Sequence, residues 1–237
     1  MQYFNRAAVT ARAAIFDLDG TLIDSLEDLA DSVNEVLSAH GYPIFAVDLY
    51  RYKVGNGSRK LIERALPEEA AKDGALVDEI LAEYKACYEK NLLHKTRPYA
   101  GIFNMLKRLQ DMGVPLAVCT NKHQSAAEKL CGELFAPGTF LEVIGDQPGL
   151  PRKPDPRKVL KLSEKMGAKP EEVAYFGDSS VDMDTAKNAG AIAIGVTWGF
   201  RPREELEEHG ARFILDMPAD LFTKVEFVTG SEASEKQ

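Results

Sequence analysis

Short apolar runs alternate with longer amphipathic stretches along most of this chain, and that pattern constrains its fold more than any other feature. The apolar runs span residues 13–16, 115–119, 173–176, 191–196 and 213–215. Each run is short enough for a strand and too apolar for a surface element. Two of the intervening stretches repeat apolar residues at helical intervals and end at Gly113 and Gly167. The alternation predicts βα units and an α/β fold with a mainly parallel sheet.

Residues 26–94 interrupt this alternation, because they contain helical patterns and no convincing strand. Two apolar stripes at helical spacing lie in this region: Leu26, Leu29, Ala30, Val33, Val36 and Leu37 form the first, and Leu76, Ile80, Tyr84 and Cys87 form the second. A helical insert of this length suggests a separate lid domain. The predicted organisation is a discontinuous α/β core, residues 1–22 and 95–237, with an all-helical cap at residues 23–94.

The two ends of the insert carry their own signals. Ser25 with Asp28, or Asp24 with Glu27, has the spacing of a capping box and predicts that a helix begins there. Residues 94–98 are expected to form the linker that returns to the core.

Charge and cysteine content exclude several classes of function. The chain has 37 acidic and 29 basic residues and a net charge of -8, so no global positive field gathers nucleic acid or anionic lipid. Its three cysteines suggest neither a disulfide framework nor a zinc site. We therefore expect a cytoplasmic protein that has a small-molecule partner and binds neither nucleic acid nor membrane.

Polar side chains follow three of the predicted strands. Asp17 and Asp19 come after the first strand, Thr120 after a second, and Asp178 and Asp182 after a later one. Ligands of parallel sheets bind beyond the carboxyl ends of the strands, so these side chains are expected to converge there. The alternatives are local: aspartates favour turns, threonine caps helices, and acids favour the first turn of a helix.

Clustered carboxylates cannot all stay ionised unless a cation holds them together. A site of few carboxylates suits Mg²⁺, which keeps several waters and completes its coordination with substrate phosphate. A lysine should then face the phosphoryl oxygens, and Lys153 is a candidate because Pro154 and Pro156 stiffen its segment. A surface lysine in a stiff loop is the alternative. The sequence therefore points to magnesium and a phosphate.

With these residues the chain resembles the haloacid dehalogenase superfamily of phosphatases. The four motifs of that superfamily occur here in order, as Asp17-x-Asp19-Gly20-Thr21, Thr120-Asn121, Lys153-Pro154 and Gly177-Asp178-x-x-x-Asp182. A closer likeness is to its phosphoglycolate phosphatases, through the segments at residues 54–57, 63–66, 119–122 and 198–200. The resemblance implies a doubly wound, Rossmann-like parallel-sheet core with a small helical cap.

The resemblance also implies roles for individual residues. Asp17 would attack phosphorus, and Asp19 would act as general acid and then as general base. Mg²⁺ would be held by Asp17, the main-chain carbonyl of Asp19 and Asp178, with Asp182 nearby. The residues expected to bind substrate are Thr120, Asn121, Lys153, Gly57 and Arg59. Arg59 would recognise a carboxylate from the cap, although a solvated helical face is an equal alternative.

The predicted activity is hydrolysis of a small phosphorylated metabolite, with 2-phosphoglycolate as the first candidate. A pyrophosphatase, a nucleotide or sugar phosphatase and a phosphosugar mutase are alternatives within the same superfamily. A phospho-accepting signalling domain also groups aspartates, a threonine and a lysine around Mg²⁺. Such a domain is shorter and lacks a helical insert after its first strand. The sequence leaves open whether the protein is a monomer or a homodimer.

Overall fold

The computed structural model describes residues 9–228, so both ends of the predicted core, residues 1–8 and 229–237, lie outside the described part. Its centre is a six-stranded sheet in the order β6-β5-β2-β7-β8-β9, in which all neighbouring strands are parallel. These strands are β2 (Ala13–Phe16), β5 (Leu116–His123), β6 (Glu142–Asp146), β7 (Val173–Gly177), β8 (Ile192–Val196) and β9 (Phe213–Leu215). Strand order runs outward in both directions from β2, which confirms the doubly wound α/β fold.

All five predicted strands are present, and the sheet contains one strand that the apolar runs did not indicate. This strand, β6, lies at the edge of the sheet, and only two of its five residues are buried. A second small sheet pairs β1 (Val9–Ala11) with β10 (Val225–Phe227).

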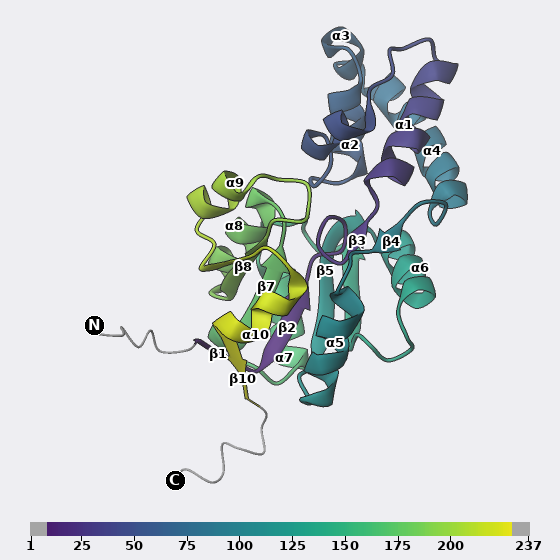
Figure 1. Cartoon of the computed structure of the whole chain (residues 1–237). Helices are drawn as coiled ribbons and strands as arrows, with labels where there is room; N and C mark the ends of the chain where they lie inside the picture. Colours follow the sequence, from purple (N-terminus) through teal and green to yellow (C-terminus); the bar gives the residue numbers. More distant parts are fainter. Residues whose placement is uncertain (1–8, 229–237) are drawn as a thin grey trace, which may run out of the picture.

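Helices cover both faces of the central sheet (Figure 1). Ala14 and Phe16 of β2 belong to the core that includes α5 (Ile102–Asp111), α6 (Gln124–Leu134) and α10 (Leu221–Lys224). Ala13 and Ile15 point to the opposite core, which is formed with α7 (Arg157–Lys165), α8 (Ser180–Ala189) and α9 (Arg203–Glu208). Because β2 is buried on both faces, its sequence is apolar without alternation. Two short 3₁₀ helices, η2 (Pro170–Glu172) and η3 (Pro218–Asp220), complete this layer arrangement.

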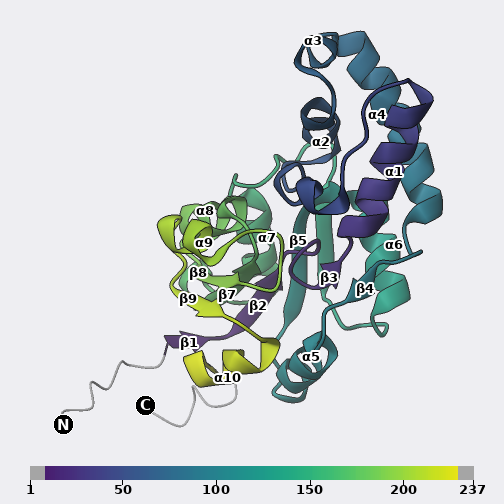
Figure 2. The same ribbon diagram turned by 45° about the horizontal axis from the view of Figure 1, so that its top comes forward.

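The helical insert forms a cap beside the carboxyl end of the sheet (Figure 2). It contains α1 (Leu26–Ala39), η1 (Val47–Tyr52), α2 (Ser58–Ala65), α3 (Glu68–Ala71) and α4 (Gly74–Asn91). Helices α1 and α4 pack against each other, and the predicted apolar stripes supply their contact faces. Every residue of the first stripe is buried, and Leu76 is the one member of the second stripe that is only partly so.

Two short strands, β3 (Ile23–Asp24) and β4 (Arg97–Pro98), connect the cap to the core and pair with each other in antiparallel fashion. Neither predicted capping box is complete within the described residues: Asp24 accepts from the Leu26 amide at 3.3 Å, but the reciprocal bond from Glu27 is absent. Ser25 precedes α1 without capping it, and its hydroxyl donates to Asp19 at 2.5 Å instead. Asp28 accepts from the main-chain N–H groups of Lys95 and Thr96 and from the Thr96 hydroxyl, at 2.8–3.0 Å. The carboxylate that was expected to cap α1 therefore ties α1 to the return linker.

None of the helices within residues 9–228 has both the length and the apolarity needed to cross a membrane.

Candidate active site

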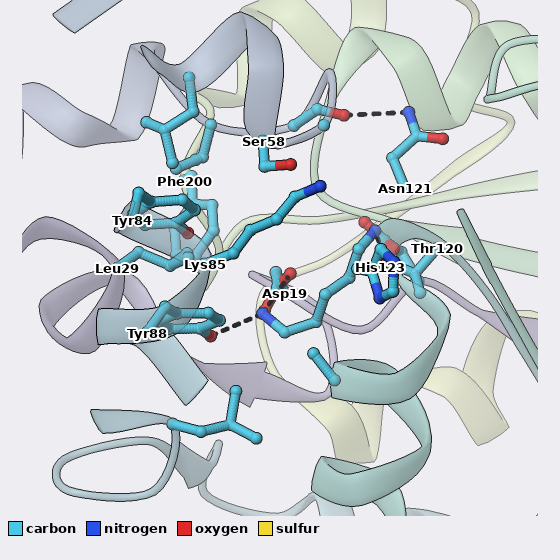
Figure 3. Close-up of a pocket in the computed structure, with 18 of the residues that line it drawn as sticks. Asp19, Leu29, Ser58, Tyr84, Lys85, Tyr88, Thr120, Asn121, His123 and Phe200 are labelled. Carbon is cyan, nitrogen blue, oxygen red and sulfur yellow. Dashed lines mark hydrogen bonds and ion pairs between the residues drawn. The ribbon is translucent and has the colours of Figure 1, made fainter. Parts of the chain in front are cut away.

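The carboxyl ends of β2, β5 and β7 meet at a cavity of about 440 Å³ beneath the cap (Figure 3). Asp17 and Asp19 follow β2, Thr120 and Asn121 belong to β5, and Asp178 follows β7. Each of these side chains lines the cavity, as the convergence of strand ends predicts. Residues of α1, α2 and α4 form its other wall, so the cavity lies between the core and the cap.

Three buried carboxylates lie close together at this edge. One oxygen from each of Asp17, Asp178 and Asp182 lies within 4.8 Å of the other two. Burial raises the pKa of Asp17 to about 6, with Lys153 opposing that shift and Asp182 adding to it. Burial also raises the pKa of Asp178 well above its ordinary range, and Asp182 and Asp17 add to the effect. The site therefore favours an added positive charge.

Three glycines lie so close to Asp178 and Asp182 that they leave no room for a Cβ atom. A Cβ atom on Gly20 would lie 2.3 Å from Asp178 Oδ2, and one on Gly199 would lie 2.3 Å from Asp178 Cβ. A Cβ on Gly177 would lie 2.1 Å from the Cβ of Asp182. Gly20 also has a φ of 83°, in the left-handed region that favours glycine. Side chains at these positions would displace the acids, so the cluster depends on their absence.

Lys153 supplies positive charge within the cluster. Its Nζ lies 2.8 Å from Asp17 Oδ1 and 2.7 Å from Asp182 Oδ1, and the side chain is buried. Burial alone would lower the pKa of Lys153, but the charges of Asp17 and Asp182 outweigh it and raise the pKa. Asp17 Oδ1 has this ion pair but no partner with hydrogen-bond geometry within the described residues. Asp17 is therefore held in place and still has a carboxylate oxygen to offer.

Asp182 has no oxygen left to offer. Its Oδ1 accepts from Lys153 and from the Tyr175 hydroxyl at 2.7 and 3.3 Å, and its Oδ2 accepts from the amide and hydroxyl of Ser179. Asp178 is less engaged, since the amide of Phe200 donates to one oxygen at 2.7 Å and the Thr21 hydroxyl reaches the other only at 3.5 Å. Asp17 and Asp178 therefore fit a cation best, and Asp182 fixes Lys153.

Thr120 and Asn121 occupy different kinds of position. Thr120 lines the cavity, and its carbonyl accepts from the buried Lys158 at 3.1 Å. The Asn121 side chain accepts from the Lys153 amide at 2.8 Å and donates to the Lys153 carbonyl at 3.2 Å. It also donates to the carbonyl of Gly55 in the cap. These contacts hold the Lys153 segment and a cap loop. Asn121 also lines the cavity, and its expected contact with substrate stays a prediction.

Asp19 lies at the boundary between core and cap. Lys122 Nζ donates to its two carboxylate oxygens at 2.9 and 3.1 Å and also lies 2.7 Å from the Tyr88 hydroxyl of α4. No role was predicted from the sequence for either Lys122 or Tyr88. Lys122 follows the Thr120-Asn121 motif directly, and Tyr88 follows Tyr84 by one helical turn. These two sequence positions are the signals from which a role at the site could have been predicted.

The structure brings only one of the two predicted cap residues to the cavity. Gly57, which precedes α2, lines it. Arg59 does not: its guanidinium pairs with Glu63 at 3.2 Å and with Asp78 of α4. Its side chain is 38% exposed, so the solvated helical face is the arrangement found.

Comparisons with known proteins agree with this geometry. The family model described as haloacid dehalogenase-like hydrolase matches residues 14–196. A phosphoglycolate phosphatase of Mesorhizobium japonicum is 37% identical over 196 residues, which cover 81% of this chain and 86% of that protein. A phosphoglycolate phosphatase of Pseudomonas putida is 33% identical over 209 residues, covering 86% of this chain and 76% of the relative. A solved structure from Lactobacillus delbrueckii subsp. bulgaricus superposes with a TM-score of 0.83 at 33% identity, covering 89% of this chain and 96% of that one.

Proposed function

The chain belongs to the haloacid dehalogenase-like hydrolases and is a phosphatase of that family, and we propose that its substrate is 2-phosphoglycolate, which it cleaves to glycolate and phosphate. The observation that carries the proposed chemistry is the position of Asp17. Its buried carboxylate lines the cavity and lies close to both Lys153 and Asp178. The names of relatives that are 33% and 37% identical support the choice of substrate. A cavity of about 440 Å³ suits a small metabolite.

In the proposed reaction Asp17 attacks phosphorus and the bond between phosphorus and the ester oxygen breaks. An aspartyl-phosphate forms, and Asp19 donates a proton to the leaving glycolate oxygen. Water then attacks the aspartyl-phosphate while Asp19 takes back a proton, and phosphate leaves with Asp17 regenerated. One carboxylate thus serves as acid in the first half-reaction and as base in the second.

Thr120 and Lys153 hold the phosphoryl group in this proposal, because a loose transition state is stabilised mainly by positioning and charge. Asp17, Asp178 and the main-chain carbonyl of Asp19 would hold Mg²⁺. When bound, the cation would neutralise the carboxylates and polarise the phosphoryl oxygens. Asp182 keeps Lys153 aimed at the site through the 2.7 Å contact between them. The raised pKa values of Asp17 and Asp178 support a cation at this position.

The test is phosphate release from a substrate panel in the presence of Mg²⁺. We expect kcat/KM for 2-phosphoglycolate to exceed the values for pyrophosphate, nucleoside monophosphates and hexose phosphates by about tenfold or more, which corresponds to at least one charged contact. Repeated turnover would exclude a stoichiometric phospho-acceptor. A higher kcat/KM for any other member of the panel would contradict the proposed substrate and leave the phosphatase chemistry in place.

A further inference from the structure

The Lys122 side chain is buried at the boundary between core and cap. It is 5% exposed, and its ammonium contacts both Asp19 oxygens and the Tyr88 hydroxyl, with the Tyr88 ring centroid 4.7 Å away. A buried ammonium has three N–H donors to satisfy, and these contacts can satisfy all of them. All of its partners line the cavity. Lys122 is therefore part of the cavity wall and not a surface lysine.

The chemistry of the proposed substrate places its carboxylate near this ammonium. Asp19 must reach the ester oxygen of the leaving group if it is to protonate it. In 2-phosphoglycolate a single methylene separates that oxygen from the carboxylate. A substrate in contact with Asp19 therefore presents its carboxylate next to Asp19, where a cation is needed to bind it.

Lys85, Lys129 and Arg201 also line the cavity, but none of them forms an ion pair with Asp19 within the described residues. Arg201 donates to the Val54 carbonyl at 3.1 Å and lies 3.5 Å from Glu205, while its buried Nη1 has no hydrogen-bond partner among residues 9–228. Lys85 points into the cavity from α4 (Figure 3) but forms no ion pair with Asp19. Within residues 9–228, Lys122 is the one cation in ion-pair contact with Asp19.

We propose that Lys122 is the specificity residue for the leaving group: it binds a carboxylate attached to the carbon that carries the ester oxygen. The inference rests on the proposed function, since it names the group that recognises that substrate. Without substrate the ammonium donates to Asp19, and with substrate one of its N–H groups passes to the incoming carboxylate. Tyr88 extends the recognition to the cap, because its hydroxyl holds the same ammonium at 2.7 Å.

The test compares 2-phosphoglycolate with ethyl phosphate, which has a methyl group in place of the carboxylate. Lys122→Met also removes the ion-pair partner of Asp19, so kcat/KM should fall on both substrates, but we expect the fall for 2-phosphoglycolate to exceed the fall for ethyl phosphate by about 100-fold. The part of the loss that is selective for 2-phosphoglycolate should lie mostly in KM. Lys85→Met is the matched control, because it removes the same charge from the same cavity, and it should change the ratio of the two kcat/KM values by less than about threefold.

A second variant keeps the proposal testable if Lys122→Met does not fold. Tyr88→Phe retains the ring and removes only the hydroxyl, so selectivity for 2-phosphoglycolate should fall by about three- to tenfold. Equal losses on both substrates, or a selective loss in Lys85→Met in place of Lys122→Met, would overturn the assignment of Lys122. A wild-type protein that does not prefer 2-phosphoglycolate to ethyl phosphate would instead refute the proposed substrate, and the assignment with it.

Discussion

The core side and the cap side of the cavity are held in different ways. On the core side, Asp17, Lys153 and Asp182 are buried and bonded to one another through side chains. On the cap side, contacts with the core run mostly from a side chain to a main-chain carbonyl, such as Arg51 to Gly199 at 3.0 Å and Asn121 to Gly55 at 3.1 Å. On the proposed function, the side-chain network of the core carries out the reaction, and the substrate is selected where the cap meets the core.

The largest expected effect belongs to the core side. Asp17→Asn removes the nucleophile without changing the size of the side chain, so turnover should fall by at least about 10⁴-fold. Phosphate release and the circular dichroism spectrum should be measured on the same preparation. Substantial activity in a folded Asp17→Asn protein would refute the covalent mechanism and weaken the contrast between the two sides.

Neutralising Asp178 tests the charge of the carboxylate cluster. Burial and two neighbouring carboxylates raise its pKa, so Asp178→Asn should raise the melting temperature of the metal-free protein by a few degrees. The same change should abolish the stabilisation that Mg²⁺ gives to the wild type, and activity should fall by about 10³-fold. A metal-free variant that melts below the wild type would mean that the cluster is not under repulsion.

The same cluster predicts a dependence on pH. The pKa of Asp17 rises from 3.8 to about 6 on folding, so in that window the folded state binds more protons than the unfolded state. The contribution of Asp17 to the free energy of unfolding therefore falls as pH rises through the window. Mg²⁺ should then raise the melting temperature more at about pH 7.5 than at about pH 5. Equal shifts at both pH values would contradict this assignment.

The connection between the two sides should matter more for stability than for chemistry. Asp28 is 1% exposed and accepts from three donors of the return linker, so Asp28→Ala should lower the free energy of unfolding by about 2 kcal/mol. Its kcat with a small aryl phosphate should change by less than about fivefold, because no contact with the carboxylate cluster is lost. Urea unfolding and steady-state kinetics measure the two effects. A loss of kcat without a loss of stability would show that Asp28 matters for the chemistry and not for the fold.

The smallest effect is expected at the exposed face of the cap. Arg59 pairs with Glu63 and Asp78 and does not line the cavity. Arg59→Ala should change kcat/KM for 2-phosphoglycolate by less than about twofold and leave the midpoint of urea unfolding almost unchanged. A selective rise in KM for 2-phosphoglycolate would restore Arg59 as the group that binds the carboxylate.

The sequence predicted the parts of the molecule that depend on local pattern. The strand of residues 13–16 is apolar throughout because both of its faces are buried, and the acids after it follow from that placement. Strand β6 escaped prediction because only Val143 and Ile144 of its five residues are apolar, whereas the other edge strand, β9, is apolar throughout. Spacing alone also suggested a capping box at Ser25, but the side chains of Ser25 and Asp28 bond residues outside α1.

Among the site residues, contacts within the core could be predicted from the sequence, and contacts between the core and the cap could not. Asp17 and Asp178 follow two neighbouring strands, so their meeting could be predicted from topology. Lys122 and Tyr88 meet only when α4 lies against the core, and no spacing in the sequence encodes that orientation. The pairing of Arg59 with Asp78 of α4, away from the cavity lining, could not be predicted for the same reason.

The carboxylate cluster depends as much on atoms that are absent as on those that react. Gly20, Gly177 and Gly199 approach Asp178 or Asp182 so closely that even a methyl group would lie within 2.3 Å of them. In a saturation mutagenesis screen for activity, these three positions should tolerate substitution as poorly as the nucleophile. None of them has a functional group. A map of mutational tolerance would therefore identify the glycines as essential, and selection at these positions would preserve space and not reactivity.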